Sequence, residues 1–192
     1  MLGEVLIFLS RRLDGYLSAR LGVVPGEPDQ PRVVLPDGEK SDPVEFQLGA
    51  VTALLVNLEL DRVQRPPDLF RQSLPNGAVA RVSPEIRMNL YILFVAHFKQ
   101  YEQGLSYLSL IIQYFQSHRT LDHTNAPELD KRIGQLTLEL TTLSFAEQGE
   151  IWSSLRTGYL PSVLYRVGMI VFQDEEAIGA PEITEETIIT TA

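Results

Sequence analysis

The chain has 192 residues, of which 44% are hydrophobic, and this suits one compact domain with an ordinary core. It has no cysteine, which excludes disulfide frameworks, thiolate metal sites and cysteine nucleophiles. The chain has 16 basic and 25 acidic residues, and its net charge is −9. Proteins that bind nucleic acid usually carry a stripe of basic residues, and this sequence has none, so we expect no nucleic-acid partner.

The N-terminal residues 2–21 predict an amphipathic helix. Their apolar side chains recur at spacings of three and four, which gathers them on one stripe, and Gly22 follows as a C-terminal cap. The apolar run at the start is about half as long as a membrane span requires. The first charged residue is Glu4, whereas a signal peptide begins with basic residues. We therefore expect a soluble cytoplasmic protein without membrane insertion.

Two strands are predicted in the next part of the chain. A short strand over 32–35 ends at a turn that begins with Pro36. Residues 50–61 alternate between apolar and more polar side chains, which predicts a longer strand with one buried face. The residues expected on the buried face are Leu54, Val56, Leu58 and Leu60.

Two stretches of opposite charge suggest a protein interface. Residues 62–83 predict a long irregular connection that is, with Arg87, the most basic part of the chain, and connections of this length often carry function. Residues 174–192 are acidic and hold no basic residue. The two stretches either dock between subunits or onto partners, or they are solvated features that never meet. The predicted interface residues are Arg65, Leu69, Phe70, Arg71, Arg81, Arg87, Asp174, Glu175 and Glu176.

The middle of the chain predicts a central strand and a helix. Residues 84–96 begin with Arg87, Asn89 and Tyr91 on a polar side and then become apolar on both faces, as in a strand covered on both sides. A helix is predicted over 102–117. Its expected buried face consists of Leu105, Leu108, Ile111, Ile112 and Phe115.

The last part of the chain predicts two more strands and a helix. The expected elements are a loop over 118–129, a strand over 133–142, a helix from Ser144 to about Thr157 and a strand over 162–172. Leu136, Leu138 and Leu140 are expected to face the core. Ser144 and Glu147 have the spacing of a capping box, which satisfies two backbone amides at a helix start.

This order of elements predicts an α/β (α+β) domain with a mixed β-sheet flanked by helices. We expect the domain to cover residues 1–173 and an acidic C-terminal tail to cover 174–192.

A search for catalytic motifs finds little. Neither phosphate-binding glycine motif (GxGxxG or GxxxxGK[ST]) occurs, and the GxSxG elbow is absent. His118 and His123 flank Asp122, a set that suits either part of a metal site or an ordinary polar loop. Glu59 and Asp61 share a strand face, which suits either acid–base chemistry or a solvated surface. We favour the second reading of each and predict no catalytic residue, metal or cofactor.

A succession of motifs resembles the N-terminal domain of the terminal cap proteins of contractile injection systems, the extracellular phage-tail-like particles of bacteria. The resemblance is strongest from Pro84 to Val171. The motifs, in the family's order, are Met88–Phe94, Tyr101–Ser109, Ile112–Phe115, Leu136–Leu140, Glu150–Leu155 and Tyr159–Val167.

This resemblance implies a tail-terminator fold and a structural role without catalytic residues. Family members form a ring, by analogy a hexamer, that closes the distal end of the inner tube and contractile sheath. The partners it implies are further copies of this chain, the tube protein and the sheath protein. It also implies assembly in the bacterial cytoplasm, within a particle that can be released.

Two other functions remain open from the sequence. The chain could be an adaptor or interaction module elsewhere in the same particle, which would share the fold but differ in its oligomeric state. It could also be a small hydrolase-type enzyme with a site around His118 and His123. A bound metal would favour the enzyme.

Overall fold

The computed structural model describes most of the chain, and the segments around residues 62–86 and after 171 largely fall outside it. The described residues are 2–22, 30–38, 43–61, 71–73, 79–81 and 87–171, with only the backbone described in 71–73, 79–81 and 170–171.

The elements follow the predicted order with two additions, a short hairpin and a short strand. They are α1 (Leu2–Leu21), β1 (Val33–Val34), β2 (Ala50–Leu60), β3 (Arg71–Ser73), β4 (Val79–Arg81), β5 (Arg87–His97), α2 (Tyr101–Ser117), β6 (Thr120–Asp122), β7 (Ile133–Thr141), α3 (Phe145–Ser154) and β8 (Ser162–Val171). The added elements are the β3–β4 hairpin and β6.

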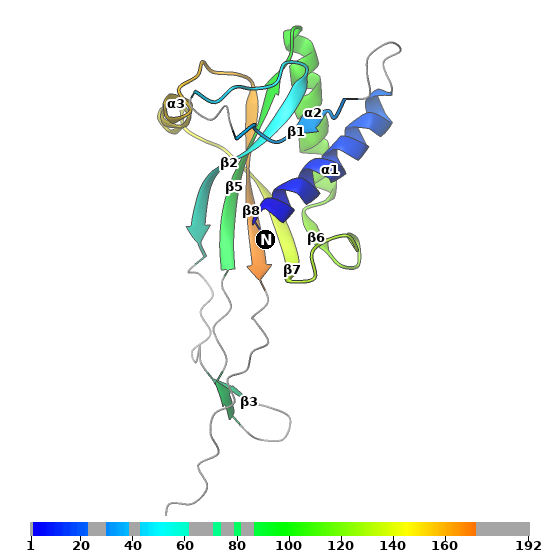
Figure 1. Cartoon of the computed structure of the whole chain (residues 1–192), viewed down its shortest axis with the longest axis vertical. Coiled ribbons are helices and arrows are strands. Elements are labelled where there is room, and N and C mark those ends of the chain that lie inside the picture. Colours follow the sequence, from blue (N-terminus) through cyan, green and yellow to red (C-terminus); the bar gives the residue numbers. More distant parts are fainter. Residues whose placement is uncertain are drawn as a thin grey trace, which may run out of the picture.

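One sheet of six strands, in the order β1-β2-β5-β8-β7-β6, organises the domain. The β1–β2 pair is parallel and the other pairs are antiparallel, so the mixed α+β sheet predicted from the sequence is confirmed. Leu60, Met88 and Met169 lie side by side in register, which brings the ends of β2 and β8 and the start of β5 to the same end of the sheet (Figure 1).

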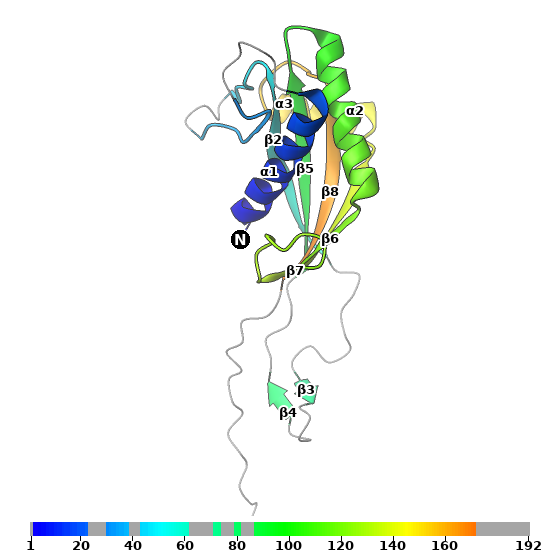
Figure 2. The same ribbon diagram turned by 90° about the vertical axis from the view of Figure 1, so that its right-hand side faces the viewer.

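Helices cover the two faces of the sheet unequally. Figure 2 shows α1 and α2 together on one face. The main core lies beneath them and includes Leu90, Ile92 and Phe94 of β5. The alternate residues Leu93 and Val95 pack on the other face with Trp152 of α3 in a smaller cluster. The central strand is therefore covered on both sides over this part of its length, as its sequence predicts.

Local sequence signals set several element boundaries. Gly22 has a φ of 71°, a left-handed conformation that glycine adopts without strain, and it ends α1. The Ser144–Glu147 capping box is present at the start of α3, as predicted. Pro36 stands just beyond β1 and has no backbone N–H to donate, which explains why this strand is only two residues long.

The predicted burial of β2 is wrong in its second half. Leu58 and Leu60 are 41% and 46% exposed, although the alternation placed them in the core. Burial in β2 changes along the strand: the first four residues are buried on both faces and the last four are exposed on both. The strand runs past the helices, and alternation shows which residues share a face without showing what covers that face.

Three further predictions need correction. Leu105 is 41% exposed, because α2 turns Gly104 toward the sheet, where an added Cβ would lie 3.5 Å from the Ala96 Cβ. Leu140, near the end of β7, is 48% exposed. The predicted loop over 118–129 contains β6, which pairs with β7.

Candidate functional site

The predicted interface residues lie mostly outside the described part of the chain. Those outside it are Arg65, Leu69, Phe70, Asp174, Glu175 and Glu176. Arg71 and Arg81 face each other in the backbone ladder of β3 and β4. Arg87 begins β5, where its carbonyl accepts the Asp61 amide at 2.8 Å. The interface stays a prediction. Of its residues, Arg87 lies at the end of the sheet where β2 and β8 end.

A polar surface covers that end of the sheet on the side that faces α3. We call it the polar face and define it by Glu59, Asn89, Tyr91, Thr137, Glu139 and Arg166. Tyr91, Arg166 and Glu139 form one row across three strands, and Asn89, Gly168 and Thr137 form the next. Four of the six defining residues are exposed, because α3 covers only the other half of this side of the sheet.

Side-chain pairs connect the strands across the polar face. The Tyr91 hydroxyl donates to Glu59 Oε2 at 2.8 Å, and this bond raises the pKa of Tyr91. Arg166 donates to Glu139, and this bond raises the pKa of the guanidinium. Both pairs are exposed, so each stabilises the fold only slightly. Glu59, one member of the carboxylate pair suggested by the sequence, accepts this bond and forms part of the polar face.

Gly168 allows the strands of the polar face to carry their side chains close together. A Cβ at this position would lie 2.5 Å from Thr137 Oγ1 and 3.6 Å from Asn89 Oδ1. Contacts below about 3 Å are sterically excluded, so a larger residue would displace Thr137. The glycine therefore leaves room for the polar side chains on either side of it.

The outer edge of β2 is open over most of its length. β1 pairs only with Val51 and Thr52. Beyond Thr52, none of the strands that the structure describes pairs with this edge (Figure 1). The Leu58 amide donates instead to the neighbouring side-chain oxygen, Asn57 Oδ1, at 2.9 Å. An open strand edge of this kind can accept a strand from another chain.

The opposite edge of the sheet, β6, is closed by a side chain. Asn125 Nδ2 donates to the Thr120 carbonyl at 3.0 Å, and the Asp122 amide donates to Asn125 Oδ1 at 3.0 Å. One outward backbone group of each residue is thus bonded by the same amide side chain, and the Asp122 carbonyl accepts from the Ala126 amide at 2.7 Å. Asn125 therefore occupies two of the groups that an added strand would need.

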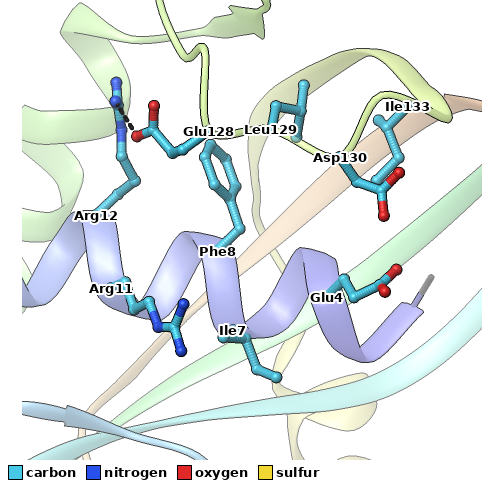
Figure 3. A pocket seen from close by; sticks show the side chains of 9 residues that line it. All are labelled: Glu4, Ile7, Phe8, Arg11, Arg12, Glu128, Leu129, Asp130 and Ile133. Carbon is cyan, nitrogen blue, oxygen red and sulfur yellow. Dashed lines mark hydrogen bonds and ion pairs between the residues drawn. The ribbon is translucent and has the colours of Figure 1, made fainter.

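A groove of about 500 Å³ lies between α1 and the segment that leads into β7 (Figure 3). Phe8 points into it toward Leu129, whereas Ile7 and Arg11 point away from that segment. Phe8 and Leu129 are 8% and 3% exposed. The groove thus has an apolar base, and charged residues surround it.

Ion pairs hold the two sides of this groove together. Arg12 Nη1 donates to Glu128 Oε1 at 2.6 Å, and Arg132 Nη2 bridges Asp130 at 2.6 Å and Glu4 at 2.7 Å. Burial lowers the pKa of Arg12, but its hydrogen bonds to Glu128 and Tyr114 outweigh this effect and raise the pKa overall. Arg12 Nη2 also donates to the Asn125 carbonyl at 3.2 Å. We therefore interpret the groove as the contact by which α1 fixes the loop that closes β6.

The hydrogen bond to Arg132 holds the pKa of the Asp130 carboxyl well below its usual range. The pKa of Glu128 is also lowered, first by its own backbone amide and then by Arg12. Both carboxyl groups are therefore ionised at neutral pH and available for these pairs.

The histidine loop has local partners. His118 stacks on Tyr114, with ring centroids 4.4 Å apart. Asp122 accepts from the Thr124 amide at 2.8 Å, and its bonds to Thr124 lower its pKa. Across the part of the chain that the structure describes, no three His, Asp or Glu side chains are grouped as metal ligands. The described helices include none with the length and apolarity needed to cross a membrane.

These features describe a mixed-sheet α+β domain whose exposed strand end suits contact with other proteins. The fold is similar to the cryo-EM structure of the PVC sheath/tube terminator in its extended state, from an extracellular contractile injection system. The TM-score is 0.56 at 15% sequence identity, and the match covers 97% of this chain and 64% of that one.

A second solved structure, the tube-terminating cap of the anti-feeding prophage, matches at 14% identity and a TM-score of 0.49, over 74% of this chain and 48% of that one. The chain thus spans less than two thirds of the length of both structures. No curated protein matches the sequence.

The family is shown by the sequence itself. Residues 4–186 match the model of the Pvc16 N-terminal domain, and the chain belongs to this family. The resemblance to cap proteins of contractile injection systems, inferred from the motifs between Pro84 and Val171, is confirmed.

The sequence reasoning missed the Asn125 cap and the Tyr91–Glu59 bond. The only signal for the first was the Asp122-x-x-Asn125 spacing, which is typical of a local turn. The second depends on the register between β2 and β5, which the sequence does not specify.

Proposed function

We propose that this protein is a structural cap that terminates the inner tube and contractile sheath of a phage-tail-like injection particle. The observation that carries the proposal is the fold, because 97% of the chain aligns with a sheath/tube terminator. Membership of the Pvc16 N-terminal domain family supports the same role.

The proposed role is structural and not enzymatic. One support is the match to a terminator structure. The other is that two carboxylates considered as catalytic or metal-binding candidates form hydrogen bonds with neighbouring side chains. Glu59 is engaged by Tyr91, and Asp122 by Thr124.

In this proposal several copies, by analogy six, form a ring that contacts the tube and sheath proteins. The particle assembles in the bacterial cytoplasm and can be released from the cell. The open edge of β2 supports such assembly because a ring needs contacts between two different surfaces of each subunit. The acidic tail and the basic stretch around Arg65 are proposed to contribute to these contacts.

The test is the mass of the purified protein in solution, alone and mixed with its tube and sheath proteins. We expect an assembly of six times the 21.6 kDa chain mass, together with shorter tubes when the protein is present during tube growth. A strict monomer that leaves tube length unchanged would contradict the proposal and favour an adaptor.

The predicted basic interface has its own test. We expect Arg65→Glu combined with Arg71→Glu to leave a cooperatively folded protein but to weaken the oligomer, and we expect the difference from the wild type to shrink at high salt, since exposed charges are screened. Lys99→Glu combined with Lys131→Glu is the matched control, because it makes the same change of charge at two exposed positions elsewhere. Equal ring formation by both double variants would remove this patch from the interface.

A further inference from the structure

The direction of the backbone groups in β2 identifies what its outer edge offers. The Val51 amide points outward and donates to the Arg32 carbonyl at 2.8 Å, whereas the Asp61 amide points inward to Arg87. Backbone groups alternate between the two edges along a strand, and a β-bulge between Leu55 and Asn57 reverses this alternation once within β2. Leu58 and Leu60 therefore direct their N–H and C=O groups away from β5.

The side chains on this edge suit an added strand. Leu58 and Leu60 are among the exposed large apolar residues of the described chain, at 41% and 46%. Natural proteins usually protect open edges with lysine, proline or a covering loop. Among the described residues the end of β2 has none of these, and it carries only the bulge between Leu55 and Asn57 and the bond from the Leu58 amide to Asn57. An incoming carbonyl would replace that bond at little cost.

The geometry limits which strand could fill this edge in a ring. Joining the β2 edge of one copy to the β6 edge of the next is blocked, because Asn125 already covers Thr120 and Asp122. Joining two β2 edges gives a symmetric dimer, which does not continue around a ring. A strand that does not belong to the sheet of its own copy could pair with β2 without using the β6 edge and without forming a closed symmetric dimer.

The end of the chain contains such a strand sequence. Residues 183–191 lie outside the described part and read Ile-Thr-Glu-Glu-Thr-Ile-Ile-Thr-Thr, which is rich in residues that favour strands. They begin twelve residues after Val171, where β8 ends, so the connection can extend about 40 Å. β8 ends about 10 Å from the end of β2, since only β5 lies between them.

We propose that residues 183–191 of one copy add as a strand to the open outer edge of β2, from Ala53 to Leu60, in a neighbouring copy. This rests on the proposed ring and names the contact that joins its subunits. Each copy donates a tail and accepts one, so the contact is between two different surfaces and can close a ring.

Two variants with complementary defects test the exchange. Removal of residues 183–192 deletes the donor, and Leu58→Lys places a charge on the acceptor edge. Alone, each variant is expected to be monomeric by native mass. Mixed, they are expected to form one-to-one dimers, because the truncated chain accepts a tail from the Leu58→Lys chain. Leu105→Lys is the control for Leu58→Lys, since Leu105 has the same 41% exposure on a helix, and it is expected to assemble normally.

Two results would overturn the exchange. Normal rings from the truncated chain would show that the tail is not the joining strand. Folded monomeric variants that form no dimer on mixing would also contradict donation between copies and would favour pairing of the tail with its own sheet.

A peptide experiment separates this proposal from the proposed function. A labelled peptide of residues 181–192 is titrated into the truncated chain, with a peptide of scrambled order as the control. We expect saturable binding to the truncated chain, with at least tenfold weaker binding to Leu58→Lys truncated in the same way. If the peptide binds but no ring forms, the docking site at the β2 edge is supported and the proposed cap function is contradicted. If rings form but the peptide does not bind, the cap function is supported and the docking site is contradicted.

Discussion

The two edges of the sheet are finished in opposite ways. At β6 the Asn125 side chain bonds the Thr120 carbonyl and the Asp122 amide, and Arg12 of α1 donates to the Asn125 carbonyl. At β2 the strand extends past the helices with Leu58 and Leu60 exposed, and none of the described strands pairs with its outer edge there.

This difference shows how one sheet can avoid uncontrolled edge association at β6 while it keeps the β2 edge available for a partner strand. An exposed strand edge pairs readily with other chains, and a protein that leaves both edges open risks uncontrolled association. Closing β6 locally leaves β2 as the edge on which a partner strand can be accepted. The polar face and Arg87 lie at the same end of the molecule as the open part of β2.

The largest expected effect comes from unpacking the closed edge. Leu121 of β6 is fully buried, so Leu121→Ala is expected to lower the free energy of unfolding by about 2–5 kcal/mol through lost contacts and a cavity. Leu60→Ala, on the open edge, is expected to lower it by less than about 0.5 kcal/mol. Urea denaturation of both variants measures the difference, and equal effects would mean that the open edge is covered.

A smaller effect is expected from the two asparagines. Asn125→Ala leaves two outward backbone groups of β6 without their partner and is expected to cost about 1–2 kcal/mol. It should also raise the tendency to associate, because a second edge is opened. Asn57→Ala removes one exposed bond and should cost about 0.5 kcal/mol or less. Thermal melts and light scattering compare the two; an Asn125→Ala variant as stable as Asn57→Ala would refute the cap.

The closed edge should also be sensitive to acid. Hydrogen bonds to Thr124 and Arg132 lower the pKa of Asp122 and of Asp130 in the folded protein. A carboxyl group whose pKa is lower in the folded than in the unfolded protein stabilises the fold at pH values above its unfolded pKa of about 3.9. This stabilisation is lost as the pH falls through the pKa of the folded protein.

The denaturation midpoint should therefore fall as the pH is lowered from 6 to about 3. Asp130→Asn should show a smaller fall, because asparagine does not titrate. Identical pH profiles for the variant and the wild type would show that this carboxyl does not contribute.

The sequence predicted the sheet better than its surroundings. The central strand β5 and the helix after Ser144 were found because periodicity and capping are local signals. β6 was missed because three residues are too short to show a period. The exposure of Leu58 was not predicted, because the apolar and polar residues of β2 alternate as they do in a half-buried strand. How much of the strand is buried depends on how far the helices extend over the sheet, which the alternation does not show.

The candidate site was less predictable than the fold. Arg87 was identified from charge, and the structure places it at the exposed sheet end. The closing role of Asn125 depends on a turn that returns the chain to Thr120, and the open edge depends on where β1 stops. Both are relations between segments, which composition and spacing do not encode.

Hydrogen exchange at two backbone amides tests the difference between the edges most directly. In the isolated protein at low concentration, we predict fast exchange of the outward Leu60 amide and slow exchange of the Asp122 amide, which Asn125 holds. In the assembled state Leu60 should become protected while Asp122 stays unchanged. A Leu60 amide that is already as protected as Asp122 in the isolated protein would contradict the account.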